Sequence, residues 1–229
     1  ENEIDVSVVM GIGWTSSELA EKSNQYIAES CLRFPDRLIG FGSINLSSTN
    51  AVNQVRNCAD IGLKGIGELH LDHQLFGIGG YELIIPVIQE IRAKNLTLSI
   101  HCSEPVGHAY PGKGSNTPEK LETLLKLSEG INLILSHWGG GLPFYGLMPE
   151  VRKLLKTVFF DTAASPFLYD SKIFEIVSSI VGPDRILAAS DYPLLGFSRI
   201  KSEIEASNLP HDDKKLLLGG NTKVLFNLH

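Results

Sequence analysis

Alternating apolar and polar side chains mark the stretch from Leu96 to His101 as a buried strand. Leu96, Leu98 and Ile100 fall on one face and the residues between them on the other, because side chains alternate along a strand. The pattern ends at His101 and gives way to a polar loop. An apolar face that packs under helices, opposite a face that ends in an imidazole, is what the wall of a parallel α/β barrel needs.

Six further apolar runs predict strands, and helical spacing of apolar residues follows each of them. The predicted strands cover residues 5–12, 38–45, 64–71, 132–137, 158–161 and 185–191. The predicted helices cover residues 16–34, 47–61, 81–94, 143–156, 170–181, 198–207 and 212–218, with others starting at 117 and 221. Residues 72–80 are predicted as a glycine-punctuated loop. Regular alternation of strand and helix indicates a parallel sheet.

The sheet is predicted to close into a barrel rather than to form an open doubly wound sheet. An open sheet gathers its site at one switch point, whereas polar residues end at least four strands here. Barrels of this class have eight βα units over about 250 residues, and seven units are visible. We therefore expect a TIM-like (β/α) barrel, one domain over residues 1–229, with the first of eight strands missing. The chain opens with Glu1 rather than Met, and we expect it to be N-terminally truncated.

Four of the predicted strands carry, at or near their ends, side chains that bind metals or move protons. Glu68, His101 and His137 are separated by 33 and 36 residues, and Asp191 follows 54 residues later. One βα unit takes roughly 30 residues, so these gaps are one, one and two units long. Barrel enzymes place their chemistry at the carboxyl ends of the strands. The two histidines and the two acids are predicted to converge on that rim.

His101 and Asp191 are the first candidates for metal ligands, since imidazole and carboxylate suit zinc, with manganese as the alternative. An open position would let the ion activate water. Taken alone, each could equally be an interior histidine or a helix-capping aspartate. His137 is the candidate catalytic proton mover or carbonyl polariser, or else a packing residue. Glu68 is a third candidate metal ligand, or else a substrate anchor or the acceptor that fixes a histidine tautomer.

A long polar loop over residues 102–116 lies directly above His101. Loops longer than about 12 residues tend to be functional in compact domains, so this one is predicted to be a substrate-binding lid, with a solvated loop as the alternative. The candidate substrate-binding residues are Glu104, His108, Tyr110 and Lys113, together with Trp138. His70 and His73 lie nearby, but a histidine pair at this spacing in a loop is too common to indicate a site. Asp161 also ends a strand on this rim and is as easily a packing residue.

Composition narrows the classes of function. A net charge of −6 with scattered basic residues argues against a nucleic-acid partner, and no apolar run is long enough to cross a membrane. Cys31, Cys58 and Cys102 form no CxxC pair, which fits reduced thiols in a cytoplasmic protein. No serine lies in a G-x-S-x-G elbow, so covalent catalysis is disfavoured. We expect a small-molecule substrate and leave a homo-oligomer open.

Short motifs at these positions resemble the amidohydrolase superfamily, in particular the TIM-barrel metal-dependent hydrolases related to aminocarboxymuconate semialdehyde decarboxylase. The motifs are FPDRLIGFGSIN at 34–45, GIGELH at 65–70, HCSE at 101–104, HWGG at 137–140, SDYP at 190–193 and GNTKVLFNL at 220–228. The resemblance implies that His101 is a metal ligand and His137 the catalytic histidine. It implies that Asp191 is both a ligand and the catalytic proton acceptor.

The first strand of that family normally supplies a His-x-His pair that also binds the metal, and no such pair occurs here. We interpret the chain as a fragment of a longer enzyme rather than as a barrel that has lost its site. The segment alone is then expected to bind metal weakly and to have little activity.

The residues and the resemblance together favour a hydrolase that acts on a carbonyl, amide or lactone carbon through metal-activated water. Asp191 would collect the proton and His137 would steady the developing oxyanion. The first alternative is a metal-dependent non-oxidative decarboxylase of an aromatic or unsaturated carboxylic acid. Basic groups above the rim would favour it, and Lys113 is the evident candidate. A non-catalytic barrel used for binding is the second alternative.

Overall fold

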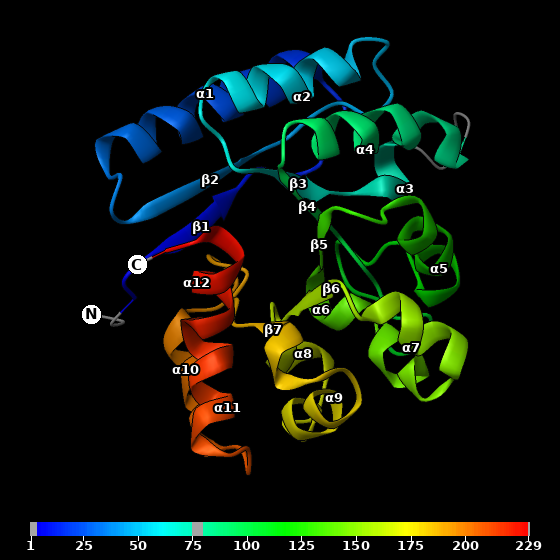
Figure 1. The fold of residues 1–229 in the computed structure, drawn as a ribbon, viewed down its shortest axis with the longest axis vertical. Helices are drawn as coiled ribbons and strands as arrows, with labels where there is room; N and C mark the ends of the chain where they lie inside the picture. The colour runs from blue at the N-terminus through cyan, green and yellow to red at the C-terminus, as the bar shows by residue number, and fades with distance from the viewer. Residues whose placement is uncertain (1–3, 75–79, 229) are drawn as a thin grey trace.

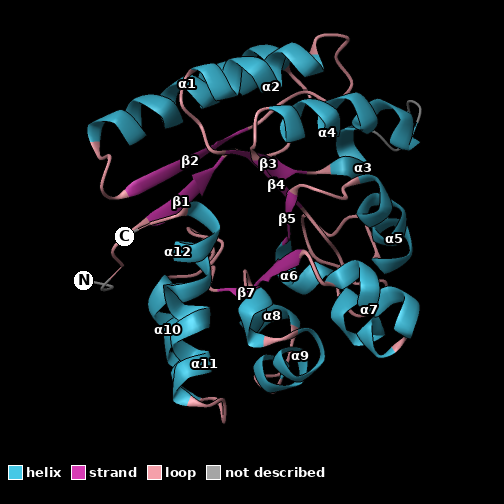
Figure 2. Ribbon diagram, viewed as in Figure 1, coloured by secondary structure: helices cyan, strands magenta, loops and turns pink. Residues whose placement is uncertain are grey.

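The computed structural model describes residues 4–74 and 80–228 and contains a sheet of seven parallel strands in sequential order (Figure 1). The strands are β1 (Ser7–Met10), β2 (Leu38–Gly42), β3 (Gly65–Leu69), β4 (Thr97–Ile100), β5 (Asn132–Leu135), β6 (Val158–Asp161) and β7 (Ile186–Leu187). The sheet curls into an open barrel, and helices cover its outer face (Figure 2). The predicted parallel barrel with seven visible strands is confirmed.

Most helices connect one strand to the next. They are α1 (Ser17–Arg33), α2 (Ala51–Asp60), α3 (Leu71–Gln74), α4 (Ile84–Ala93), α5 (Pro118–Leu127), α6 (Ser136–Gly139), α7 (Pro149–Leu155), α8 (Ser165–Leu168), α9 (Ile173–Val181), α10 (Phe197–Ala206), α11 (His211–Lys215) and α12 (Asn221–Phe226). The short segments η1 (Gly80–Leu83), η2 (Leu142–Leu147) and η3 (Pro183–Arg185) are 3-10 helices, and η4 (Leu216–Gly220) is a π-helical turn. Within the described ranges, no helix is both long enough and apolar enough to cross a membrane.

Several elements differ from the sequence pattern for identifiable reasons. The last strand ends at Leu187, because the backbone of Ala189 bonds to the side chain of Thr162 instead of continuing the ladder. The helix predicted over 81–94 begins at Ile84, so Pro86 falls in its first turn, where a missing N–H costs nothing. The predicted loop over 72–80 contains part of α3, and residues 75–79 lie outside the described ranges.

Two apolar layers lie on opposite faces of the sheet. On the outer face, α1, α2, α4, α5 and α7 bury a continuous cluster against strand residues such as Leu98 and Leu133. The inner layer consists of Ile39, Phe41, Ile134, Phe159 and Leu187. The neighbours Leu133 and Ile134 belong to different layers, because successive strand side chains point to opposite faces.

Side chains from residues 225–228 pack against the inner face of the sheet. Leu225, Phe226 and Leu228 pack against the inner layer, and the Phe226 ring meets the Phe41 ring edge-on with centroids 5.8 Å apart. The same cluster includes Val8 of β1 and Leu187 of β7. Helix α12 therefore lies between the first and last strands and packs against both (Figure 1).

We predict that Phe226→Ala lowers the free energy of unfolding by about 2 kcal/mol, because an aromatic ring is lost from a packed interior. Val224 lies on the same helix and is 77% exposed, so it provides a matched control. Val224→Ala should change the free energy by less than about 0.5 kcal/mol. Urea unfolding followed by circular dichroism measures both, and equal losses would show that this face of α12 does not support the barrel.

Candidate metal centre

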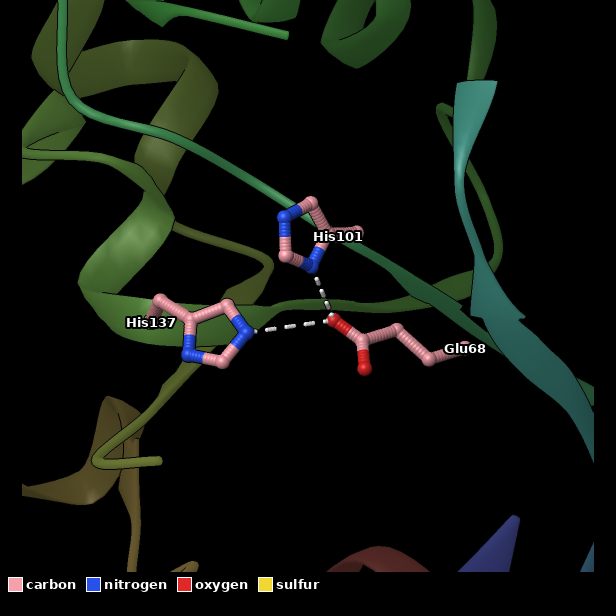
Figure 3. Close-up of side chains that lie close together, drawn as sticks. All are labelled: Glu68, His101 and His137. Atoms are coloured by element: carbon pink, nitrogen blue, oxygen red, sulfur yellow. Dashed lines mark hydrogen bonds and ion pairs between the residues drawn. The ribbon is translucent and has the colours of Figure 1, made fainter. Parts of the chain in front are cut away.

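Three side chains meet at the carboxyl ends of β3, β4 and β5 (Figure 3). Glu68 Oε1 lies 2.9 Å from His101 Nδ1 and 3.4 Å from His137 Nε2. One nitrogen from each ring and the carboxylate oxygen all lie within 4.8 Å of one another. These strands are neighbours in the sheet, so their ends are adjacent even though the residues are far apart in sequence. The predicted convergence of these three residues is therefore present.

The far nitrogen of each ring is tied to a backbone carbonyl. His101 Nε2 donates to the carbonyl of Gly112 at 3.1 Å, and His137 Nδ1 donates to the carbonyl of Ala163 at 3.1 Å. A carbonyl oxygen can only accept, so both of these nitrogens carry the proton. Glu68 Oε1 can also only accept, so without a metal ion a ring must be protonated at the facing nitrogen as well to donate to it. A neutral ring with its proton on the far nitrogen would instead offer the lone pair of the facing nitrogen to a metal ion, and the three facing atoms would then all be electron-pair donors.

Interactions within the cluster shift the pKa values of His137 and Glu68 in opposite directions. Burial alone would lower the pKa of His137, but the hydrogen bond and the charge of Glu68 outweigh it and raise the pKa to about 10. Burial alone would raise the pKa of Glu68, but hydrogen bonds from His101 and His137 hold it well below its usual range. Without a metal ion, a proton on His137 thus supplies the positive charge that the cluster requires.

The donor set fits a divalent first-row metal ion. Two imidazole nitrogens and one carboxylate oxygen are ligands found together in zinc enzymes, where three protein ligands leave a fourth position for water or substrate. Backbone carbonyls at the far ring nitrogens fix the rings in the way that metal-binding histidines generally require. The residues present could therefore hold a metal ion between Glu68, His101 and His137.

Asp191 is not one of these three donors. It follows β7, its backbone is left-handed with φ 63°, and the residue is exposed. Burial raises the pKa of its carboxyl group, the charge of His137 lowers it, and that of Glu68 raises it. It is therefore near the cluster without being among the three donors that lie within 4.8 Å. The expectation that His101 and Asp191 form the primary ligand pair, and the catalytic role of Asp191, stay predictions.

Hydrogen bonds between its own residues stabilise the long loop over residues 102–116. Lys113 Nζ donates to the carbonyls of Val106 at 2.7 Å and His108 at 3.1 Å, and the Tyr110 hydroxyl donates to Glu104 at 2.9 Å. The His108 side chain is exposed and packs near the Tyr110 ring. These four predicted substrate-binding residues thus support the loop itself, and substrate contact by any of them stays a prediction.

Two contacts attach this loop to the metal centre and to α3. The Gly112 carbonyl reaches His101, as described above. Asp72 accepts hydrogen bonds from the backbone and hydroxyl of Ser115 and from the backbone of Asn116. The loop therefore lies over the rim and determines how His101 is oriented.

Trp138 does not lie at the site, contrary to the prediction. Its side chain is fully buried, its indole N–H donates to Ser165 Oγ at 2.6 Å, and its ring packs edge-on against Phe174. The chain turns sharply after His137, so the Trp138 side chain points into an apolar cluster that also contains Phe174 and is separate from the two layers described above. Trp138 is a core residue.

His70 is a site residue that the sequence analysis missed. Its ring stacks on His101 with centroids 4.1 Å apart, and its Nε2 donates to the Gly112 carbonyl at 3.3 Å. Burial and the charge of His101 lower its pKa. The available signal was strand alternation, because His70 follows Glu68 by two positions and so points to the same side.

A parallel barrel with carboxylate and imidazole ligands at its carboxyl rim has the architecture of metal-dependent amidohydrolases. The sequence profile of the family described as Amidohydrolase matches residues 4–228, and the chain belongs to that family.

Among the curated relatives, gamma-resorcylate decarboxylase of Rhizobium radiobacter is 24% identical over 254 residues, covering 92% of this chain and 76% of the relative. The enzyme of the same name from Polaromonas sp. is 21% identical, covering 93% of this chain and 78% of the relative. The solved structure of 2,6-dihydroxybenzoate decarboxylase from Rhizobium superposes with a TM-score of 0.75 at 17% identity, over 99% of this chain and 85% of that one. Dihydroxybenzoic acid decarboxylase from Polaromonas sp., solved with manganese and the inhibitor 2-nitroresorcinol, gives 0.72 at 17% identity, over 99% and 80%.

These relatives correct the expected reaction. Three curated relatives that the chain matches are all named gamma-resorcylate decarboxylase. The expectation of a hydrolase that attacks a carbonyl, amide or lactone carbon is therefore wrong. Metal-activated water and a decarboxylase site use the same ligand types, so the ligands alone could not separate the two reactions.

We predict a pH-dependent loss of stability in the metal-free protein. The pKa of His137 is raised from about 6.5 to about 10 on folding, so its stabilisation is complete below pH 6.5 and is lost as the pH rises toward 10. The stability advantage of the wild type over His137→Gln should shrink by more than about 1 kcal/mol across that window. Urea unfolding at pH 6 and pH 10 measures it, with His108→Gln at an exposed position as the control. Parallel curves for wild type and His137→Gln would contradict the ion pair with Glu68.

Proposed function

We propose that this chain carries the metal centre of a non-oxidative decarboxylase that acts on small aromatic carboxylic acids. The observation that carries the proposal is the convergence of Glu68, His101 and His137 on one point at the barrel rim. The reaction is inferred from the relatives, which are decarboxylases, and the substrate class from the ligands bound in two solved decarboxylase structures, 2,6-dihydroxybenzoate and 2-nitroresorcinol.

Glu68, His101 and His137 would hold a divalent ion. Zinc is the expectation from ligand type, and manganese is the ion named in the structures of relatives. A bound divalent ion supplies positive charge that attracts the anionic oxygens of an aromatic acid. The two backbone carbonyls at Gly112 and Ala163 keep both imidazoles aimed at that point, so the ligands need no rearrangement before binding.

The reaction breaks the bond between the ring carbon and the carboxylate, and a proton takes the place of carbon dioxide. The electron pair of the broken bond stays on the ring carbon and then forms the new C–H bond. Asp191 is the proposed proton donor, because it follows β7 and its carboxyl group lies near enough to Glu68, His101 and His137 to interact with their charges. The residue is exposed, so solvent can return the proton after each turnover.

The loop over residues 102–116 would exclude water from the reacting carbon. Lys113 would close the loop, because its ammonium group donates to two carbonyls within it. Direct contact between Lys113 and the substrate stays a prediction. Tyr110 and Glu104 would keep the inner part of the loop in place.

We predict that the manganese-supplemented protein, produced together with any natural residues that flank the segment, releases carbon dioxide from at least one acid in a panel containing 2,6-dihydroxybenzoate and 5-carboxyvanillate. Asp191→Asn should lower kcat by about 100-fold or more, because the proton donor is lost while the ligands remain. Glu68→Gln and His101→Ala should lose bound manganese along with activity. Gas release, product identity by mass spectrometry and metal analysis measure these outcomes.

Lys126→Met on the exposed side of α5 is the matched control and should keep both metal and turnover. Full turnover in Asp191→Asn would refute the proton donor. Bound manganese without carbon dioxide release from any acid of the panel would contradict the decarboxylase and leave a metal-binding barrel.

A further inference from the structure

The backbone at His137 is held in a conformation that non-glycine residues rarely adopt. Its φ and ψ are 56° and 48°, and Trp138 follows with φ 56°. A left-handed conformation is unfavourable for such residues and persists only where surrounding contacts enforce it. Contacts that enforce this conformation must therefore surround His137.

Asp161, the last residue of β6, supplies the central contact. Its Oδ1 accepts the backbone N–H of His137 at 2.9 Å and the backbone N–H of Ala163 at 3.0 Å. The side chain is buried with 7% exposure, so water cannot replace it easily. One carboxylate oxygen thus joins the turn after β5 to the turn after β6.

The link to Ala163 has a second effect. The carbonyl of Ala163 accepts the proton on His137 Nδ1 at 3.1 Å. Asp161 therefore fixes His137 twice, directly through the backbone N–H and indirectly by holding the residue whose carbonyl orients the ring. Both effects leave Nε2 directed at Glu68, at 3.4 Å.

The turn after β6 is itself anchored. The hydroxyl of Thr162 accepts the N–H of Ala189 and donates to its carbonyl, both at 2.9 Å, which ties this turn to the end of β7. Ser165 Oγ accepts from the Trp138 indole and donates to the Thr162 carbonyl. The segment that holds His137 is thus rigidly connected to the neighbouring strand ends.

From these contacts we infer that Asp161 is a positioning residue for the metal centre, which acts through His137 and contacts neither metal nor substrate. The inference rests on the proposed function, in which His137 is a ligand. Partners that orient a ligand histidine commonly contribute 10- to 100-fold in metal affinity. The contribution expected here comes from hydrogen-bond acceptance by one oxygen, which an amide oxygen can also provide.

The test compares Asp161→Asn with Asp161→Ala. Asparagine keeps an acceptor for both N–H groups, whereas alanine removes it. Asn221→Ala is the matched control for lost stability, because Asn221 is also buried and donates to two backbone carbonyls, of Pro183 and Ile186. Neither of these hydrogen bonds involves His137, Ala163 or Glu68.

Zinc affinity, measured by competition with a chromophoric chelator, is the first readout. Asp161→Ala should weaken zinc binding by about tenfold or more, while Asp161→Asn and Asn221→Ala stay within about threefold of the wild type. Equal weakening in Asp161→Ala and Asn221→Ala would reduce Asp161 to a stabilising residue and overturn the inference. Unchanged affinity in Asp161→Ala would overturn it as well.

The second readout needs no metal and separates the two proposals. In metal-free protein the buried Nδ1–H of His137 should give a slowly exchanging proton resonance, assigned by its loss in His137→Gln. The resonance should persist in Asp161→Asn and disappear in Asp161→Ala. If wild-type protein binds no zinc but this pattern holds, the metal centre fails and the positioning by Asp161 stands. Persistence of the resonance in Asp161→Ala would refute the positioning directly.

Discussion

The need for positive charge between one carboxylate and two imidazoles is the constraint on which this site depends. Glu68 Oε1, His101 Nδ1 and His137 Nε2 face one another, because backbone carbonyls hold the protons on the opposite ring nitrogens. Such a group persists only with positive charge at its centre, either a proton or a cation. The sheet enforces the arrangement by ending three adjacent parallel strands at the same level. The fold that brings the three strand ends together therefore also creates the need for a positive charge between them.

The parallel strands and the convergence of the three side chains could be predicted from the sequence, because both follow from strand periodicity. Alternation places His101 opposite the apolar face of its strand, and the regular spacing of βα units brings Glu68 and His137 to the same rim. The seven strands and their parallel order follow from the same pattern. These features depend on local side-chain alternation and on chain length between strands, and both can be read along the chain.

Features set by turns and by contacts between loops could not be predicted. Trp138 follows His137 directly, but a left-handed turn sends its indole into the core. His70 obeys strand alternation with Glu68, yet only the fold shows that it stacks on His101. The reaction was also out of reach, since a hydrolase and a decarboxylase present the same ligand types. Named relatives were needed to correct it.

The carbonyl of Gly112 is a hydrogen-bond acceptor shared by two imidazole rings, since both His70 and His101 donate to it. Gly112 has φ +92°, a conformation that side chains rarely adopt, so few residues could present that oxygen in the same way. A single peptide plane at the tip of a surface loop thereby controls ring orientation beneath it. Engineering the loop for a new substrate would alter the affinity for the metal, even with every ligand left in place.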